Sequence, residues 1–236
     1  MALKFEDIKQ AFIDEVDHDK KCIEYYKLIR SGDASYKTAS QLAARIGECL
    51  GKVLKRHAPE TSVYDWDLTD LLPKSLGLDH RMVATACEQI QEQMNKDAGL
   101  GIKPKAPKFD YDRVQGMIKE LEDHADRFED IEKSFYDQLC NFSQNVVDEA
   151  IRDNMQLMAR AGIKTQVVRQ AEFKACQWCR DVAGVYDYAD VKNTGNDVWR
   201  RHENCRCTID YITEYNGSMY RERTGAGYGL RTPQYE

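Results

Sequence analysis

Four cysteines and one histidine lie close together near the carboxyl end of the chain. The motif Cys176-x-x-Cys179 is followed, after 22 intervening residues, by His202-x-x-Cys205-x-Cys207. Thiolate sulfur and imidazole nitrogen are ligands that Zn²⁺ prefers, and a Cys-x-x-Cys turn places two sulfurs on one side of a tetrahedral site. The pattern predicts one zinc ion per chain, held by Cys176, Cys179, His202 and one further sulfur. The spacing leaves open whether Cys205 or Cys207 is that fourth ligand.

The expected metal is structural, because four protein ligands leave no position for an activated water. The chain lacks the His-x-Glu and Pro-Cys-x-x-Cys elements of nucleobase deaminases. His202-Glu203 is not followed by the second histidine of a metalloprotease motif. A redox Cys-x-x-Cys belongs at the head of a helix in a strand-helix-strand unit, which the pattern around Cys176 does not indicate. The reducing cytoplasm expected for this chain also disfavours a disulfide.

Other residues with chemical potential are interpreted as structural. Four cysteines fall on or beside helical apolar stripes and are expected in the core: Cys22, Cys49, Cys87 and Cys140. An acidic run is expected to be the solvated face of a helix: Glu120, Glu122, Asp123, Asp126, Glu129, Asp130 and Glu132. Three alternating glycines lack the strand and helix that a phosphate-binding loop needs: Gly225, Gly227 and Gly229.

The elements that must position the cysteine and histidine motif are mainly helices. Apolar residues three to four apart predict a helix over 3–30, broken near His18-Asp19, and a second from Ser35 to His57. Residues 66–77 are expected to be irregular because of Pro73, with Asp79 capping a third helix. Residues 1–98 are therefore a helical N-terminal region, and residues 99–108, rich in glycine and proline, a linker.

The longest apolar stripe runs through residues 109–163. It contains no proline, and its only glycine near the start is Gly116. The spacing predicts one continuous helix of about 50 residues, about 75 Å long at 1.5 Å per residue. A helix of that length is typical of a coiled-coil arm or of a spine between two parts of an assembly.

A different pattern follows in residues 164–213, which are expected to form a small zinc-binding module. Val167 and Val168 favour a short strand, and Thr208 to Ile212 favour another. Zinc binding can supply about 10–16 kcal/mol, enough to fold such a module. Residues 214–236 are expected to be a flexible tail. The fold class is thus mainly α, with one very long helix and a zinc-stapled β-hairpin or knuckle.

Composition limits the classes of function. The chain has 236 residues, a formal charge of −6 and 42 % hydrophobic residues. This balance excludes a basic nucleic-acid coat, although the acidity is concentrated in 101–150 and the last third is slightly basic. No stretch is apolar enough to span a membrane, and residues 1–15 do not have the layout of a signal peptide. The expected protein is soluble, without membrane contact.

The runs CQWCRDVAGVYDY and WRRHENCRCTIDY resemble the C-terminal module of the Mu F-like minor head protein family, also called phage head morphogenesis proteins. That module has a Cys-x-x-Cys, a glycine a few residues on (here Gly184) and a His-x-x-Cys-Arg-Cys that ends in a short strand. The match covers about residues 165–213, roughly a fifth of the chain.

The resemblance implies a minor capsid protein of a tailed phage or prophage. Such a protein is assembled in the host cytoplasm and lies in the virion, in the head interior or at the portal vertex. It acts in head assembly, DNA packaging or ejection, with the portal protein and other head proteins as partners and no small-molecule substrate. Independently of the resemblance, basic residues interleaved with aromatic ones suggest contact with double-stranded DNA through Arg200, Arg201, Arg206 and the tail. The equal alternative is that these residues bind an acidic protein surface.

No enzymatic activity is expected, and two alternatives stay open. The first is a zinc-dependent DNA-binding protein, whose affinity would fall steeply with salt. The second is a nuclease or toxin built on a treble-clef-like module. That module would use His202 as a general base, which conflicts with its use as a zinc ligand.

Overall fold

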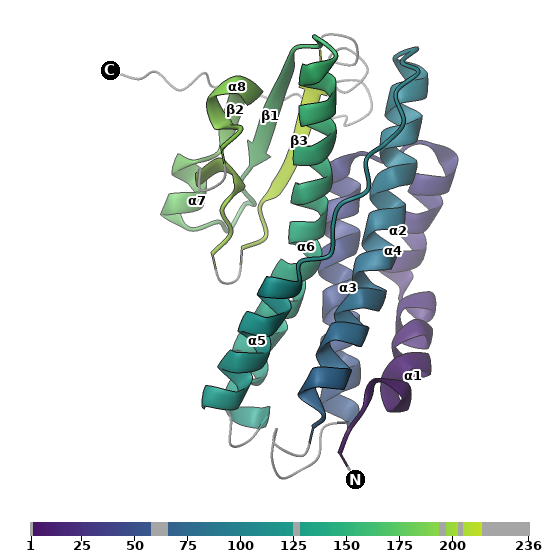
Figure 1. Cartoon of the computed structure of the whole chain (residues 1–236), viewed down its shortest axis with the longest axis vertical. Coiled ribbons are helices and arrows are strands. Elements are labelled where there is room, and N and C mark those ends of the chain that lie inside the picture. Colours follow the sequence, from purple (N-terminus) through teal and green to yellow (C-terminus); the bar gives the residue numbers. More distant parts are fainter. Residues whose placement is uncertain (1, 58–65, 125–127, 194–196, 203–204, 214–236) are drawn as a thin grey trace.

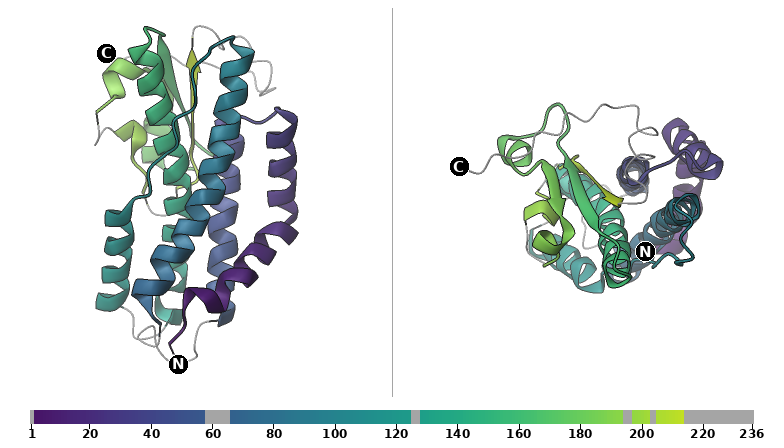
Figure 2. Two further views of the ribbon diagram at one scale, coloured as in Figure 1. Left: turned by 45° about the vertical axis from the view of Figure 1, so that its right-hand side comes forward. Right: turned by 90° about the horizontal axis from the view of Figure 1, so that it is seen from above.

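The computed structural model describes residues 2–57, 66–124, 128–193, 197–202 and 205–213. Six longer helices form an elongated bundle, and a small sheet stands beside one half of it (Figures 1 and 2). The helices are α1 (Phe5–His18), α2 (Lys20–Ser31), α3 (Tyr36–His57), α4 (Leu68–Asp97), α5 (Tyr111–His124) and α6 (Phe128–Arg160). The mainly α fold class is confirmed.

The sheet is antiparallel, with strand order β2-β1-β3. Its strands are β1 (Thr165–Gln170), β2 (Gly184–Asp187) and β3 (Thr208–Thr213), joined by the short helices α7 (Gln177–Asp181) and α8 (Tyr188–Val191) and a 3-10 turn at Asp197–Trp199. The two strands expected from the sequence are β1 and β3. The strand β2 was not expected, because its four residues contain a glycine and an aspartate.

The break between α1 and α2 falls at Asp19, as expected. The Asp19 carboxylate accepts hydrogen bonds from the backbone N–H groups of Lys21 and Cys22, both at 3.1 Å, and so caps α2. It also binds the guanidinium of Arg45 on α3, with the shortest N–O distance 2.6 Å. The hydrogen bond from Arg45 lowers the pKa of Asp19 to about 2. The Asp19 side chain therefore caps the start of α2 and also holds α2 against α3.

The expected irregular segment 66–77 and the cap at Asp79 are wrong. Helix α4 begins at Leu68, after Asp67, whose carboxylate accepts from the backbone N–H of Asp70 at 3.2 Å. Pro73 lies inside α4. A proline inside a helix costs about 3 kcal/mol, but each buried leucine stabilises the fold by about 1.5–3 kcal/mol. The fully buried side chains of Leu71, Leu72 and Leu76 outweigh that cost.

The continuous helix expected over 109–163 is also wrong, because this segment forms two helices that lie side by side. The Nε2 atom of Gln138 on α6 donates to Oε1 of Glu120 on α5 at 2.9 Å. A straight helix would separate residues 18 positions apart by about 27 Å. The chain reverses direction between α5 and α6, and the apolar spacing continues on α6 after the reversal. The spacing alone therefore does not reveal that the helix is interrupted.

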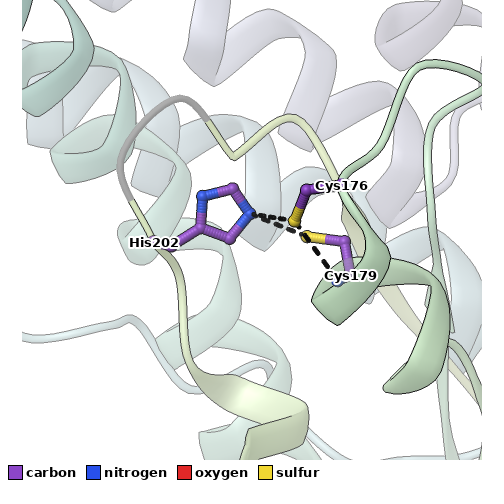
Figure 3. Close-up of side chains that lie close together, drawn as sticks. All are labelled: Cys176, Cys179 and His202. Atoms are coloured by element: carbon purple, nitrogen blue, oxygen red, sulfur yellow. Dashed lines mark hydrogen bonds between the residues drawn. The ribbon is translucent and has the colours of Figure 1, made fainter.

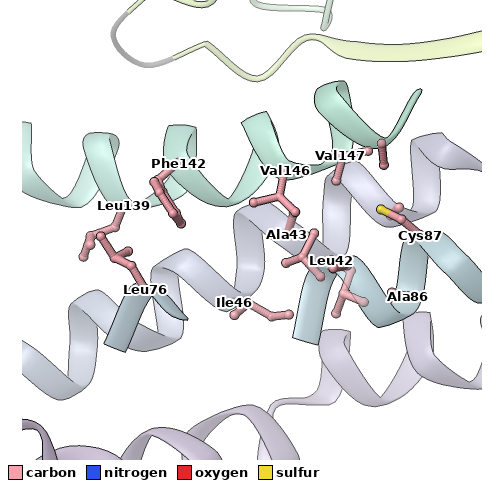
Figure 4. Packing of buried hydrophobic residues seen from close by; sticks show 14 of the residues in the cluster. Leu42, Ala43, Ile46, Leu76, Ala86, Cys87, Leu139, Phe142, Val146 and Val147 are labelled. Carbon is pink, nitrogen blue, oxygen red and sulfur yellow. The ribbon is translucent and has the colours of Figure 1, made fainter. Parts of the chain in front are cut away.

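Helix α6 has 33 residues and lies in the core rather than in a projecting arm. Figure 4 shows Leu139, Phe142 and Val146 of α6 in one cluster with Ala43 of α3 and Leu76 of α4, and all five are buried. The interpretation of this segment as a spine or coiled-coil arm is therefore corrected. The long apolar stripe reflects burial on several sides within one bundle.

Two glycines let α3 and α6 approach closely. A Cβ atom added at Gly47 would lie 2.8 Å from the Cα atom of Cys140 on α6. One turn on, Gly51 faces the ring of Tyr136, whose hydroxyl donates to the backbone oxygen of Glu48 at 2.8 Å. The backbones leave no room for a side chain at Gly47.

The sheet shares its core with the helices. Tyr36 of α3 and Tyr211 of β3 both donate hydrogen bonds to Oε1 of Gln91 on α4, at 2.8 and 2.7 Å. Nε2 of Gln91 in turn donates to Oδ1 of Asn95 at 2.7 Å. All four side chains are buried, and one hydrophobic cluster continues from the bundle to Ile209. The core therefore runs across the expected module boundary at residue 164.

The connection over residues 99–108 has neither helix nor strand and runs along the bundle (Figure 1). Asn154 of α6 holds it through both backbone groups of Lys105, at 2.9 and 3.0 Å. Among the described helices, none has the length and apolar content needed to cross a membrane.

Candidate metal centre

Cys176 and Cys179 are positioned by the start of α7. The Cys176 side chain caps this helix, and its Sγ atom accepts from the backbone N–H of Cys179 at 3.5 Å. Helix α7 lies between β1 and β2, so a strand-helix-strand unit exists that was not expected. It differs from a redox unit because β1 and β2 pair antiparallel and α7 has only five residues.

His202 faces both sulfurs of this turn (Figure 3). Its Nε2 atom lies 2.9 Å from Sγ of Cys179 and 3.3 Å from Sγ of Cys176. The ring packs edge-on against Trp178, with 5.6 Å between ring centroids. The His202 backbone oxygen accepts a hydrogen bond from Nδ2 of Asn141 at 3.1 Å, which ties the loop to α6. The structure thus brings together three of the five candidate ligands.

Cys205 and Cys207 approach the same turn from the segment that precedes β3. Sγ of Cys205 lies 3.9 Å from Sγ of Cys179. The five donors form two overlapping triads, Cys176–Cys179–His202 and Cys179–Cys205–Cys207, and within each triad all ligand atoms lie within 4.8 Å of one another. Cys179 is the donor that both triads share.

Two of the three distances between these donors suit a tetrahedral zinc site, and the 2.9 Å between Sγ of Cys179 and Nε2 of His202 is shorter than such a site requires. With Zn–S bonds of about 2.3 Å and Zn–N bonds of about 2.0 Å, sulfurs lie about 3.8 Å apart and sulfur and nitrogen about 3.5 Å apart. The Cys179–Cys205 and Cys176–His202 distances are close to these values. The donor set therefore fits a metal ion of the kind that thiolate and imidazole prefer.

The environment favours a thiolate at Cys205. A hydrogen bond from Cys207 and the charges of Arg201 and Arg169 lower the pKa of Cys205 to about 4. The same hydrogen bond, together with burial, raises the pKa of Cys207. Burial raises the pKa of Cys179. Among these sulfurs, negative charge is therefore favoured at Cys205.

Arg169 is a functional candidate that sequence reasoning missed. Its Nη1 atom donates to the backbone oxygens of Asp197, Val198 and Arg200, at 3.2, 2.5 and 2.8 Å. Its Nη2 atom lies 3.9 Å from Sγ of Cys205. Arg169 shares the buried face of β1 with Thr165 and Val167. An arginine in phase with apolar strand residues was the signal that could have identified it.

Arg201 forms a buried ion pair with Asp148 of α6. The Nε–Oδ2 and Nη2–Oδ1 distances are 2.5 and 2.8 Å, and the two side chains are 3 % and 1 % exposed. Nη1 of Arg201 also donates to the backbone oxygen of Cys207 at 2.8 Å. This pair fixes both ends of the His202–Cys207 loop on the bundle. It was not expected, because Asp148 is 53 residues away in the sequence.

The arginines expected to contact DNA therefore differ in availability. Arg201 is wrong as a DNA contact because its guanidinium is buried against Asp148. Arg206 is partly buried, 3.7 Å from Asp137. Arg200 is exposed. The expected tail contacts, including Arg221, Arg223 and Arg231, lie outside the described residues, as do Gly225, Gly227 and Gly229.

The other candidates take the positions expected for structural residues. The four scattered cysteines, Cys22, Cys49, Cys87 and Cys140, are all buried. Of the acidic run, Glu120, Glu122 and Asp123 are exposed, and Glu132 pairs with Lys55 at 2.6 Å. The side chains of Asp126, Glu129 and Asp130 lie outside the description.

The fold and the cluster define a mainly helical protein with a C-terminal cysteine and histidine site able to hold a metal ion. A family comparison then identifies the chain: the VG15 protein family matches residues 30–227, and the chain belongs to it. It is therefore a phage protein. No curated protein and no solved structure matches the chain. The finer resemblance to Mu F-like minor head proteins stays a prediction.

Proposed function

We propose that this phage protein is a minor capsid protein of the head, with one structural zinc ion and no enzymatic activity. It lies in the virion at the head interior or portal vertex and contacts the portal protein during head assembly, DNA packaging or ejection. Membership of a phage family and the motif from Cys176 to Cys207 support this assignment.

The position of His202 is the observation that carries the structural role of the metal. Its Nε2 atom is 2.9 and 3.3 Å from two cysteine sulfurs, which supports its use as a ligand rather than as a general base. The nuclease or toxin alternative needs that nitrogen for proton transfer. Four protein ligands would close the coordination shell and leave zinc to stabilise the fold.

Cys205 is our choice for the fourth ligand. Its sulfur lies 3.9 Å from Sγ of Cys179 and accepts a hydrogen bond from Nη2 of Arg169, also at 3.9 Å. Hydrogen bonds to ligand atoms orient them and tune the metal. In this arrangement Cys207 lies beside the ligands, and its backbone oxygen holds Arg201.

Three measurements test the proposal. Purified protein should contain one zinc per chain, and Cys205→Ala should lower zinc affinity more than Cys207→Ala. A tagged chain expressed during phage growth should sediment with purified heads and co-purify with the portal ring. Absence from heads would contradict the capsid assignment. Plasmid cleavage with Mg²⁺ that His202→Ala abolishes, while zinc is retained, would establish the nuclease instead.

A further inference from the structure

A cavity of about 480 Å³ opens between α2, α3 and the sheet, and none of the five candidate metal ligands lines it. Pockets of this volume are typical of small-molecule sites. Its walls carry four basic side chains, Lys21, Lys37, Arg45 and Arg206, and three amides, Gln41, Gln144 and Gln170. The helical and sheet parts of the fold both contribute to these walls, so the cavity exists only in the assembled chain.

Three of these residues have a buried polar atom without a hydrogen-bond partner in the described part of the chain. They are Oε1 of Gln144, Nε2 of Gln170 and Nη1 of Arg206. Gln144 is 2 % exposed, and its Nε2 atom donates to Oγ of Ser40 at 3.3 Å. Buried polar groups in folded proteins are nearly always paired. The atoms themselves are covered by protein, so these two donors and one acceptor pair with a ligand only when the lining side chains turn toward the cavity.

The charge that is available in the cavity is positive. Arg45 is already bound to Asp19 and Glu48, and Lys21 to Glu24. Lys37 forms no side-chain ion pair with a described residue, and Arg206 forms one ion pair, with Asp137 at 3.7 Å, through Nη2. Of the two lining carboxylates, Glu48 is engaged by Arg45 and Glu172 is exposed. An anionic group fits the wall formed by Lys37, Arg206 and Gln170.

An aromatic ring stands at the edge of the same cavity. Phe173 lines it and is 97 % exposed, the highest value among the large hydrophobic side chains with described exposure. Phenylalanine side chains are usually buried, and an isolated exposed ring beside basic residues is the arrangement on which nucleic-acid bases stack. The Phe173 ring therefore favours a ligand that carries a flat aromatic group close to its anionic group.

We propose that this cavity binds a nucleoside 5′-phosphate, either free or as one unit of a single-stranded nucleic acid. The phosphate oxygens accept from Lys37, Arg206 and Gln170, and the base stacks on Phe173. Oε1 of Gln144 accepts from a base or sugar donor. The site uses no metal ligand and does not depend on the assignment as a head protein, so either proposal can fail alone.

Binding is measured on the full zinc-loaded chain with three probes: dTMP and inorganic phosphate by calorimetry, and fluorescein-labelled oligo-dT by anisotropy. Phe173→Ala should weaken dTMP and oligo-dT binding about tenfold and leave phosphate unchanged, because only a base stacks. Lys37→Gln should weaken all three and reduce the salt slope of oligo-dT binding by about 0.7. Lys133→Gln, which removes an exposed lysine outside the cavity, is the matched control and should bind normally.

The two sources of the phosphate are told apart by comparing probes. Binding of dTMP that competes with oligo-dT identifies the nucleotide itself as the ligand, and binding of oligo-dT alone identifies a strand. Both outcomes support the site if Phe173→Ala and Lys37→Gln weaken them in variants whose circular dichroism melts are unchanged. The proposal is overturned if neither dTMP nor oligo-dT binds at millimolar concentration, if only Lys133→Gln has an effect, or if poly-glutamate competes as well as oligo-dT.

Discussion

The ion pair between Arg201 and Asp148 should contribute strongly to stability when only one partner is removed. Its side chains are 3 % and 1 % exposed and make two contacts of 2.5 and 2.8 Å. Burial alone would lower the pKa of Arg201, but the Asp148 carboxylate more than offsets this, so the pKa is raised and the charge is retained. Asp148→Leu leaves that charge buried without a partner and should lower the free energy of unfolding by about 3–5 kcal/mol.

The paired replacement separates this effect from loss of packing. Asp148→Leu combined with Arg201→Met removes both charges and should recover all but about 1 kcal/mol, the contribution of the lost hydrogen bond to the Cys207 oxygen. Urea unfolding followed by circular dichroism, at fixed zinc concentration, measures each variant. Arg200→Met, at a neighbouring exposed position, should change stability by less than about 0.5 kcal/mol. The reasoning would be refuted if Asp148→Leu alone lowered the free energy of unfolding by less than about 1 kcal/mol. It would also be refuted if the losses from Asp148→Leu and Arg201→Met simply added in the double variant.

Three further predictions concern the metal centre, the helix contact and a buried acid. Cys179→Ser should lower zinc content more than Cys176→Ser, because Cys179 belongs to both triads; equal losses by metal analysis would contradict this. Gly47→Ala should destabilise by about 1–3 kcal/mol through overpacking, whereas Gly116→Ala, in open space on α5, should stabilise by about 0.5–1 kcal/mol in the same thermal melts. Burial raises the pKa of Asp79 to about 8. The native state therefore keeps a proton that the unfolded state releases, and stability falls between about pH 4 and pH 8 by up to about 1.4 kcal/mol per unit. Asp79→Asn should flatten that fall in urea titrations, and parallel curves for the two proteins would show that Asp79 is already ionised.

Local patterns in the sequence predicted much of the helical fold. The break at Asp19, the start of α3 and the strands β1 and β3 all depend on residues adjacent in the chain, such as a capping carboxylate or a β-branched pair. The reversal between α5 and α6 was missed because apolar spacing reports which face of a helix is buried and not the direction of the next helix. Pro73 misled for a related reason, since tertiary burial of neighbouring leucines outweighed its local cost.

The candidate site divides in the same way. The five sulfur and nitrogen donors were identified because metal ligands are restricted to few residue types at characteristic spacing. The groups that hold them in place were not, since Asp148 and Asn141 lie on α6 and reach the loop only in the folded chain. Aspartate and asparagine are common on helices, so neither residue type indicates this role in the sequence.

The hydrogen bonds at Gln91 link the last strand to the middle of the chain. Tyr211 lies 120 residues after Gln91, and the strand that carries it begins directly after Cys207. While the chain is being translated, all six long helices leave the ribosome before this strand does. Until then the side of α3 and α4 that receives Tyr211 stays hydrated. Closure of the bundle therefore waits for synthesis of the complete metal-binding motif, so a nascent chain cut short before β3 presents an open helical core to chaperones and proteases.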